Sequence, residues 1–178
     1  MIIQTDADGT IYRGNLLVSL GWRYVNFLFK EKKYLSFIDR LIRLPLFYFL
    51  SHLPFCIGAA FVPFKGCPVE LAEEIKKPIR GKWLKVVERI NPEKILVISR
   101  QEKNLLRAFI NNSPELKKYN IEIISNIADV SYGKFTSNFK ILIKPYHKHR
   151  YVDENLIYLG DLRDYLFWGR GKNKFVLV

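Results

Sequence analysis

The fold is decided by residues 2–10, which read IIQTDADGT. Ile2 to Thr5 form a short run that opens with two isoleucines, as expected of a buried strand. The run leads directly into Asp6-Ala7-Asp8-Gly9-Thr10, where two carboxylates two residues apart precede a glycine. This arrangement predicts a buried strand whose carboxyl end carries a polar loop.

Four further aliphatic runs have the character of strands. They span Lys94 to Ile98, Ile121 to Ile124, Leu156 to Leu159 and Phe175 to Val178. The first of these leads into Ser99 and the third into Gly160-Asp161. Short, nearly continuous aliphatic runs favour a parallel sheet that is covered by helices.

Helical periodicity separates these strands. Apolar residues at three- and four-residue intervals predict one helix that ends before Asn91-Pro92: Ala72, Ile75, Ile79, Trp83, Val86, Val87 and Ile90. Gln101 to Asn112 shows the same pattern. The expected fold class is therefore α/β, a Rossmann-like parallel sheet with helices on both faces and ligands at the carboxyl ends of the strands.

Residues 14–81 form an insert that is several times longer than an ordinary crossover. The insert holds most of the aromatic excess, and Pro45, Pro54 and Pro63 are expected to divide it into short helices. We therefore predict a small all-helical cap at 14–81 and an α/β core domain at 1–13 and 82–178.

The two carboxylates of the first loop are suited to phosphate-ester chemistry. One can attack phosphorus while the other protonates the leaving oxygen and later activates water. A divalent cation would relieve their repulsion, and Mg²⁺ prefers such oxygen ligands. The alternative is an Asp-rich turn in which Gly9 supplies a positive φ.

Two more loops fall in the order that such a site needs. Ser99 follows the second strand, where its hydroxyl can donate to a phosphoryl oxygen, although a turn or N-cap role is the alternative. Gly160-Asp161-Leu162-Arg163-Asp164 follows the next strand and offers two acids for a metal, or Asp161 as a helix cap.

On these residues the chain resembles the haloacid dehalogenase-like superfamily from Ile2 onward, and its helical insert is similar to that of the phosphoserine-phosphatase-like branch. The resemblance implies that Asp6 is the nucleophile, which forms an aspartyl-phosphate, and that Asp8 is the general acid/base. It also implies that Ser99 is the second-motif hydroxyl. Mg²⁺ would then bind Asp6, the Asp8 carbonyl and Asp161, with Asp164 as the acid that follows.

Two features depart from the pattern of that superfamily. The acids of the fourth motif are usually spaced more widely, so that Asp164 can point away from the metal. The third-motif lysine is ambiguous among Lys140, Lys144 and Lys148, of which we prefer Lys144 and place Lys148 second. Further phosphate or substrate contacts are expected from Gly9, Thr10 and Arg13.

The composition bounds the partners and the compartment. A net charge of +12 favours anionic partners, such as phosphorylated metabolites or acidic lipids. Nucleic acid is disfavoured, since no basic helix face with interleaved aromatics is found. Two cysteines and no signal-peptide pattern predict reduced thiols in a cytoplasmic protein.

The stretch from Leu44 to Phe64 is uncharged and long enough to span a bilayer, with Arg40, Arg43 and Lys65 at its edges. Its prolines, and the separation that a span would impose on the catalytic loops, argue instead for a cap core or a surface helix. Bacterial phosphatidylglycerophosphate phosphatases of this branch carry an insert of similar character. Peripheral contact with the inner face of the membrane is thus an open alternative.

The sequence therefore predicts a Mg²⁺-dependent phosphomonoester hydrolase that acts on a phosphorylated small molecule. Two alternatives remain, namely a lipid-phosphate phosphatase at the membrane surface and a catalytically inactive binding module of the same fold.

Overall fold

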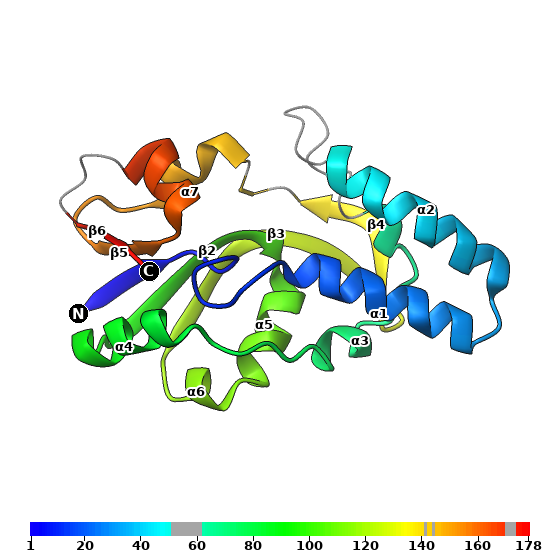
Figure 1. Ribbon diagram of the computed structural model, residues 1–178, viewed down its shortest axis with the longest axis horizontal. Coiled ribbons are helices and arrows are strands. Elements are labelled where there is room, and N and C mark those ends of the chain that lie inside the picture. The colour runs from blue at the N-terminus through cyan, green and yellow to red at the C-terminus, as the bar shows by residue number, and fades with distance from the viewer. Residues whose placement is uncertain (51–61, 141, 144, 170–173) are drawn as a thin grey trace.

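Six strands form one mixed sheet in the order β4-β3-β2-β1-β5-β6 (Figure 1). The computed structural model describes residues 1–50, 62–140, 142–143, 145–169 and 174–178. The strands are β1 (Ile2–Thr5), β2 (Lys94–Glu102), β3 (Ile121–Ser131), β4 (Lys134–Lys140), β5 (Ile157–Gly160) and β6 (Phe175–Leu177). Five of them run parallel and β4 is antiparallel to β3, which confirms the Rossmann-like α/β prediction.

The first strand lies at the centre of the parallel part. Ile3 pairs with Ile95 on one side and with Ile157 on the other, and it is fully buried. A strand with neighbours on both edges and helices above and below has little exposed surface, which explains why Ile3, Gln4 and Thr5 are all buried. The strands β2 and β3 are longer than the runs that predicted them.

The edge strand β4 was not predicted. It joins β3 through a turn at Tyr132 and Gly133, which have φ angles of 49° and 70°, and positive φ at both central residues is typical of a tight hairpin. The sequence of β4, KFTSNFK, lacks a continuous apolar run because the buried Phe135 shares the strand with the exposed residues Lys134, Asn138 and Lys140.

Helices cover both faces of the sheet (Figure 1). One face carries α3 (Glu70–Glu73), α4 (Gly81–Ile90), α5 (Lys103–Asn111) and α6 (Pro114–Lys117), and the other carries η2 (Pro145–Tyr151), α7 (Leu162–Asp164) and the turn η3 (Tyr165–Gly169). The prediction of one continuous helix from Ala72 to Ile90 was wrong, because the chain is irregular between α3 and α4. Pro78 lies in this break, and the N–H group of Arg80 donates instead to the carbonyl of Ile11 (2.8 Å).

The insert contains a pair of long helices, α1 (Leu16–Lys30) and α2 (Tyr34–Leu50), which project beside β4 (Figure 1). Pro45 does not divide α2, contrary to prediction, since the helix continues through it. Pro54 lies outside the described residues, and Pro63 lies in a short 3₁₀ turn. Within the described residues, no helix is long and apolar enough to cross a membrane.

The insert is tied to the β3–β4 hairpin by backbone hydrogen bonds. The N–H of Gly66 donates to Phe135 (2.8 Å), that of Phe135 to Cys67 (3.0 Å) and that of Val69 to Gly133 (2.9 Å). Cys67 is a buried free thiol, as predicted, and Cys56 lies outside the described residues. The hairpin therefore supports the insert, and the boundary of the cap at residues 14–81 stays a prediction.

Candidate active site

The carboxyl ends of β1 and β5 bring three carboxylates together. The two strands are parallel neighbours, and the N–H group of Asp6 donates to the carbonyl of Leu159 (3.0 Å). Asp6 follows β1 and Asp161 follows β5. One carboxylate oxygen each from Asp6, Asp161 and Asp164 lies within 4.8 Å of the others.

A lysine lies between two of these acids. Nζ of Lys148, in η2, is 2.6 Å from Oδ1 of Asp6 and 2.8 Å from Oδ2 of Asp164. The ammonium group also lies 5.7 Å from the centre of the Tyr158 ring, and the residue is only 6% exposed. Lys148 was our second choice for the third-motif lysine, and the preferred Lys144 lies outside the described residues.

Asp164 does not point away from the candidate metal site, although only two residues separate it from Asp161 in the sequence. Oδ1 of Asp161 accepts from the N–H group of Asp164 (3.0 Å), so that Asp161 also caps α7, which is the alternative role that the sequence allowed. This short turn orients Asp164 toward the site, where Oδ2 also accepts from the hydroxyl of Tyr158 (2.8 Å).

Asp8 is held by three neutral donors. Its carboxylate accepts hydrogen bonds from the hydroxyl of Tyr12 (2.5 Å), from the amide of Asn15 (3.3 Å) and from the amide of Gln101. Burial raises the pKa of Asp8, although the hydrogen bonds from Tyr12 and Gln101 oppose the shift. A raised pKa lets a carboxyl group carry the proton that a general acid must give away.

The surroundings of Asp6 disfavour the ionised form of its carboxyl group. Burial raises its pKa from 3.8 to about 7, against the opposing effect of the Lys148 ammonium, and the nearby Asp164 adds to the rise. An ionised Asp6 thus requires more positive charge than Lys148 alone provides.

The remaining predicted residues have different surroundings. Ser99 is buried, and its Oγ accepts from the N–H group of Gln101 (3.2 Å), which leaves the hydroxyl hydrogen able to donate. Thr10 is fully buried, and its Oγ1 has no hydrogen-bond partner among the residues that the structure describes. Arg13 is exposed, and its carbonyl accepts from Lys77 (3.4 Å).

Gly9 allows two loops to meet. Its φ is 79°, and a Cβ atom added there would lie 2.7 Å from Oδ2 of Asp161. Nη1 of Arg80 donates to the carbonyl of Gly9 and to that of Val178 (3.2 Å). The glycine is therefore needed for both its backbone angle and the close approach of Asp161.

Several residues of the site were missed by sequence reasoning. These are Tyr12, Asn15, Arg80, Gln101, Tyr158 and Arg163. Only Asn15 carried a signal, because a polar residue before an apolar helix predicts an N-cap, which it provides for α1 through Val18 (3.2 Å).

The residues fit a divalent cation. The carboxylates of Asp6 and Asp161 are oxygen ligands of the type that Mg²⁺ prefers. Because Gly9 has no Cβ atom, the carboxylate of Asp161 can lie against the Asp6–Asp8 loop.

Comparison with known proteins agrees with this architecture. No protein-family model and no curated protein sequence matches the chain. A hydrolase of the haloacid dehalogenase (HAD) family from Salmonella enterica serovar Typhi is similar in structure, with a TM-score of 0.63 and 15% identity over 97% of this chain. The chain spans 60% of the length of that hydrolase.

Two phosphoserine phosphatase structures are also similar. One, a phospho-aspartyl intermediate analogue, gives a TM-score of 0.58 at 13% identity over 99% of this chain and 85% of its own. The other, a substrate-bound complex, gives 0.56 at 14% identity over 93% of this chain and 79% of its own. The protein therefore has the HAD-like fold. Within that class its arrangement is the phosphoserine-phosphatase-like one, as the sequence predicted.

Proposed function

We propose that this protein is a Mg²⁺-dependent phosphomonoester hydrolase with Asp6 as its nucleophile. The observation that carries the proposal is the cluster of Asp6, Asp161 and Asp164 at the carboxyl ends of neighbouring parallel strands, in which Lys148 pairs with Asp6 and Asp164. Such an arrangement offers a nucleophile and positive charge at the place where α/β proteins bind ligands.

The reaction requires two displacements at phosphorus. The carboxylate of Asp6 attacks phosphorus, a P–O bond to Asp6 forms, and the P–O bond to the leaving alcohol breaks. Asp8 donates its proton to the leaving oxygen and then takes a proton from the water that attacks the aspartyl-phosphate, so that Asp6 and inorganic phosphate are released.

The other side chains stabilise charge and hold groups in position. Lys148 neutralises Asp6 and the phosphoryl oxygens, and the hydroxyl of Ser99 donates to the phosphoryl group. Tyr12, Asn15 and Gln101 fix the carboxyl group of Asp8. Mg²⁺, held by Asp6, Asp161 and the carbonyl of Asp8, would supply further positive charge against phosphate.

A panel of phosphate esters tests the proposal. We expect turnover that requires Mg²⁺, stops in excess chelator and is lost in Asp6→Asn. The exposed Asp129 provides a matched control, because Asp129→Asn removes a carboxylate of the same sheet outside the site. Binding of Mg²⁺ and phosphate analogues without hydrolysis of any ester would instead indicate the inactive binding module.

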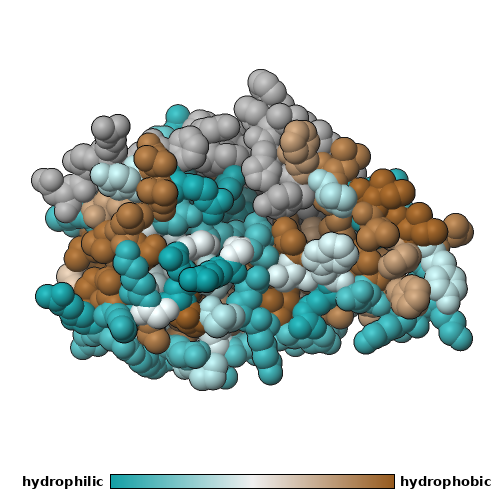
Figure 2. All heavy atoms as spheres, viewed as in Figure 1, coloured by the Kyte–Doolittle hydropathy of each residue, from teal (hydrophilic) through white to brown (hydrophobic). Residues whose placement is uncertain are grey.

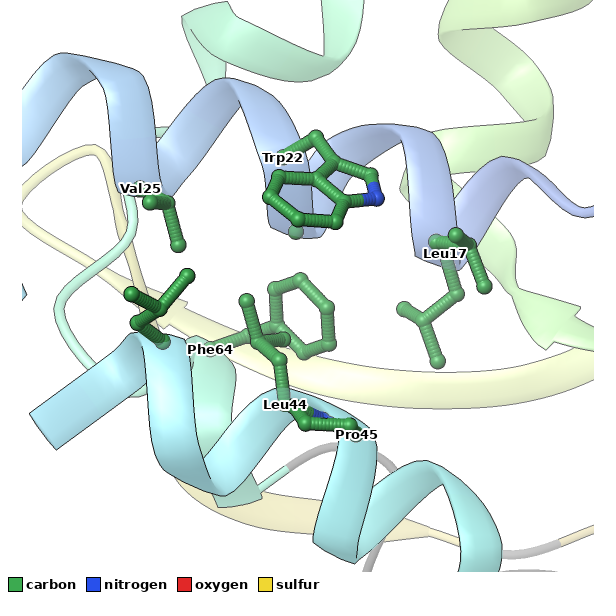
Figure 3. A pocket seen from close by; sticks show the side chains of 9 residues that line it. Leu17, Trp22, Val25, Leu44, Pro45 and Phe64 are labelled. Carbon is green, nitrogen blue, oxygen red and sulfur yellow. The ribbon is translucent and has the colours of Figure 1, made fainter.

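A second candidate is a substrate whose phosphate is joined to a hydrocarbon group, and this hydrocarbon group binds the insert. A cavity of about 430 Å³ lies between α1 and α2 and is lined by Leu17, Val18, Gly21, Trp22, Val25, Leu41, Leu44, Pro45 and Phe64 (Figure 3). Its first lining residue, Leu17, lies two positions after Asn15, whose amide donates to Asp8. This proximity in sequence supports a substrate that extends from the phosphate site along α1.

The outer surface of the insert supports a lipid phosphate as that substrate. Hydrophobic side chains gather over α1 and α2 (Figure 2), and the exposed ones on α2 include Ile38, Ile42, Leu46 and Phe49. Arg40 and Arg43 of the same helix both pair with Asp39, and a net charge of +12 favours anionic membranes.

Two measurements test this candidate. The kcat/KM for alkyl phosphates should rise with chain length in the wild type and in Leu35→Glu, which alters an exposed leucine outside the cavity, but not in Leu41→Glu. Vesicles that contain phosphatidylglycerol should carry the protein upward in flotation at low salt. A flat chain-length series together with no flotation would remove the lipid phosphate.

A further inference from the structure

A second positively charged side chain, that of Arg163, contacts the candidate metal site. Arg163 lies in α7, and its Nε and Nη2 are 3.0 and 2.9 Å from Oδ2 of Asp161. Nη2 also lies 3.5 Å from the main-chain carbonyl oxygen of Asp8. One guanidinium group thus joins two oxygens from two different loops.

Both oxygens belong to the set that the proposed function assigns to Mg²⁺. The carboxylate of Asp161 and the carbonyl of Asp8 cannot keep their hydrogen bonds to Arg163 and also bind a cation there without rearrangement. Arg163 therefore competes with a metal for the same oxygens.

The two positive side chains of the site differ in their freedom to move. The side chain of Lys148 is 7% exposed and is held between Asp6 and Asp164, whereas that of Arg163 is 65% exposed. Lys148 cannot leave without exposing a buried pair of acids. Arg163 can turn into water at small cost, because exposed ion pairs contribute little stability.

We infer that Arg163 is a displaceable internal cation, which holds Asp161 and the Asp8 carbonyl in the metal-free protein and leaves them when a divalent cation binds. It keeps two loops rich in oxygen ligands together while no metal is present. Displacement lowers the apparent affinity for Mg²⁺, because the hydrogen bonds to Arg163 must break first. The inference rests on the proposed metal site but does not require turnover.

Calorimetric titration of the full chain with Mg²⁺ tests the inference. Arg163→Gln should bind Mg²⁺ several-fold more tightly than the wild type, since an exposed ion pair no longer competes. Arg163→Lys keeps the charge without the planar fork and should lie between the two. Arg89→Gln, which removes an exposed arginine of α4 outside the site, corrects for the change in net charge.

The outcomes separate competition from support. Tighter binding in Arg163→Gln than in Arg89→Gln, with Asp161→Asn abolishing binding, is the expected result even if no ester is hydrolysed. Weaker or equal binding in Arg163→Gln would overturn the inference, as would the absence of Mg²⁺ binding in both proteins. Circular dichroism melting curves of each variant show that the fold is retained.

Discussion

Lys148 is the residue on which the electrostatics of the site depend most. Its ammonium group contacts Asp6 and Asp164 at 2.6 and 2.8 Å in a region with little solvent. Without it, two buried carboxylates would face each other uncompensated. A buried charge whose partner is removed costs far more than an exposed one.

Replacing Lys148 should therefore destabilise the protein as well as inactivate it. For Lys148→Met we expect the free energy of unfolding, measured in urea without metal, to fall by about 3 kcal/mol or more. Lys118→Met is the matched control, because Lys118 pairs with Glu88 (3.1 Å) at the surface, where both side chains are about half exposed. Equal stability of the two variants would contradict the buried role of Lys148.

Asp6 should make stability depend on pH in the direction opposite to that of most acids. The unfolded chain ionises this group near pH 3.8, whereas burial raises its pKa in the folded protein to about 7. Its contribution to stability is complete below pH 3.8 and is lost as the pH rises through about 7. Between these two pH values the free energy of unfolding falls by about 1.4 kcal/mol per pH unit.

Asp6→Asn should then be more stable than the wild type at pH 8 without metal, although it is inactive. Lys148 keeps Asp164 as a partner in this variant. Thermal melting at pH 5 and pH 8 measures the effect, and the advantage of the variant should grow between them. A variant that is less stable than the wild type at both pH values would contradict the burial penalty.

At the scale of elements, the loop after β1 depends on a glycine that faces the loop after β5. In Gly9→Ala the left-handed backbone is strained by about 1–2 kcal/mol, and the new methyl group meets Asp161. We expect a loss of hydrolysis of at least about tenfold together with weaker Mg²⁺ binding.

Gly81→Ala is the control for this prediction. Gly81 begins α4, and a Cβ atom there would meet nothing within 4 Å. Activity should be unchanged and stability equal or slightly higher, because alanine favours helix. Unimpaired Mg²⁺ binding in Gly9→Ala would show that the two loops do not share a cation.

The strands were predictable because burial on both faces leaves a continuous aliphatic run, as in Ile95 to Ile98. The break between α3 and α4 was not, since its residues keep helical spacing while Pro78 and the contact from Arg80 to Ile11 interrupt the helix. Conversely, α2 continues through Pro45 because tertiary packing outweighs one missing N–H donor. Whether packing outweighs a missing hydrogen bond cannot be predicted from the local sequence.

The same distinction applies to the site. Asp6, Ser99 and Asp161 were found because each follows a predicted strand, and the topology brings strand ends together. Lys148 could not be chosen over its neighbours, since it lies in the 3₁₀ segment η2, where neither a strand nor a helical period fixes the direction of a side chain. The supports of Asp8 were missed because Tyr12 and Gln101 carry no spacing signal.

At the scale of the whole molecule, the net charge of +12 should attract anionic substrates. The kcat/KM for a phosphate monoester is expected to fall several-fold as NaCl rises from about 20 to about 200 mM, because salt shortens the range of the field. The kcat should change little, since the buried groups are screened less. A kcat/KM that is independent of salt would show that the charge does not steer substrate.

Hydrolysis by the proposed route requires a covalent bond between Asp6 and phosphorus. Acid quenching during turnover of an aryl phosphate with Mg²⁺, followed by peptide mapping by mass, tests it most directly. We expect one phosphoryl group on the peptide that contains Asp6, removable by hydroxylamine and missing in Asp6→Asn. Continued hydrolysis by Asp6→Asn at the wild-type rate, with no phosphoryl group on that peptide, would contradict the account.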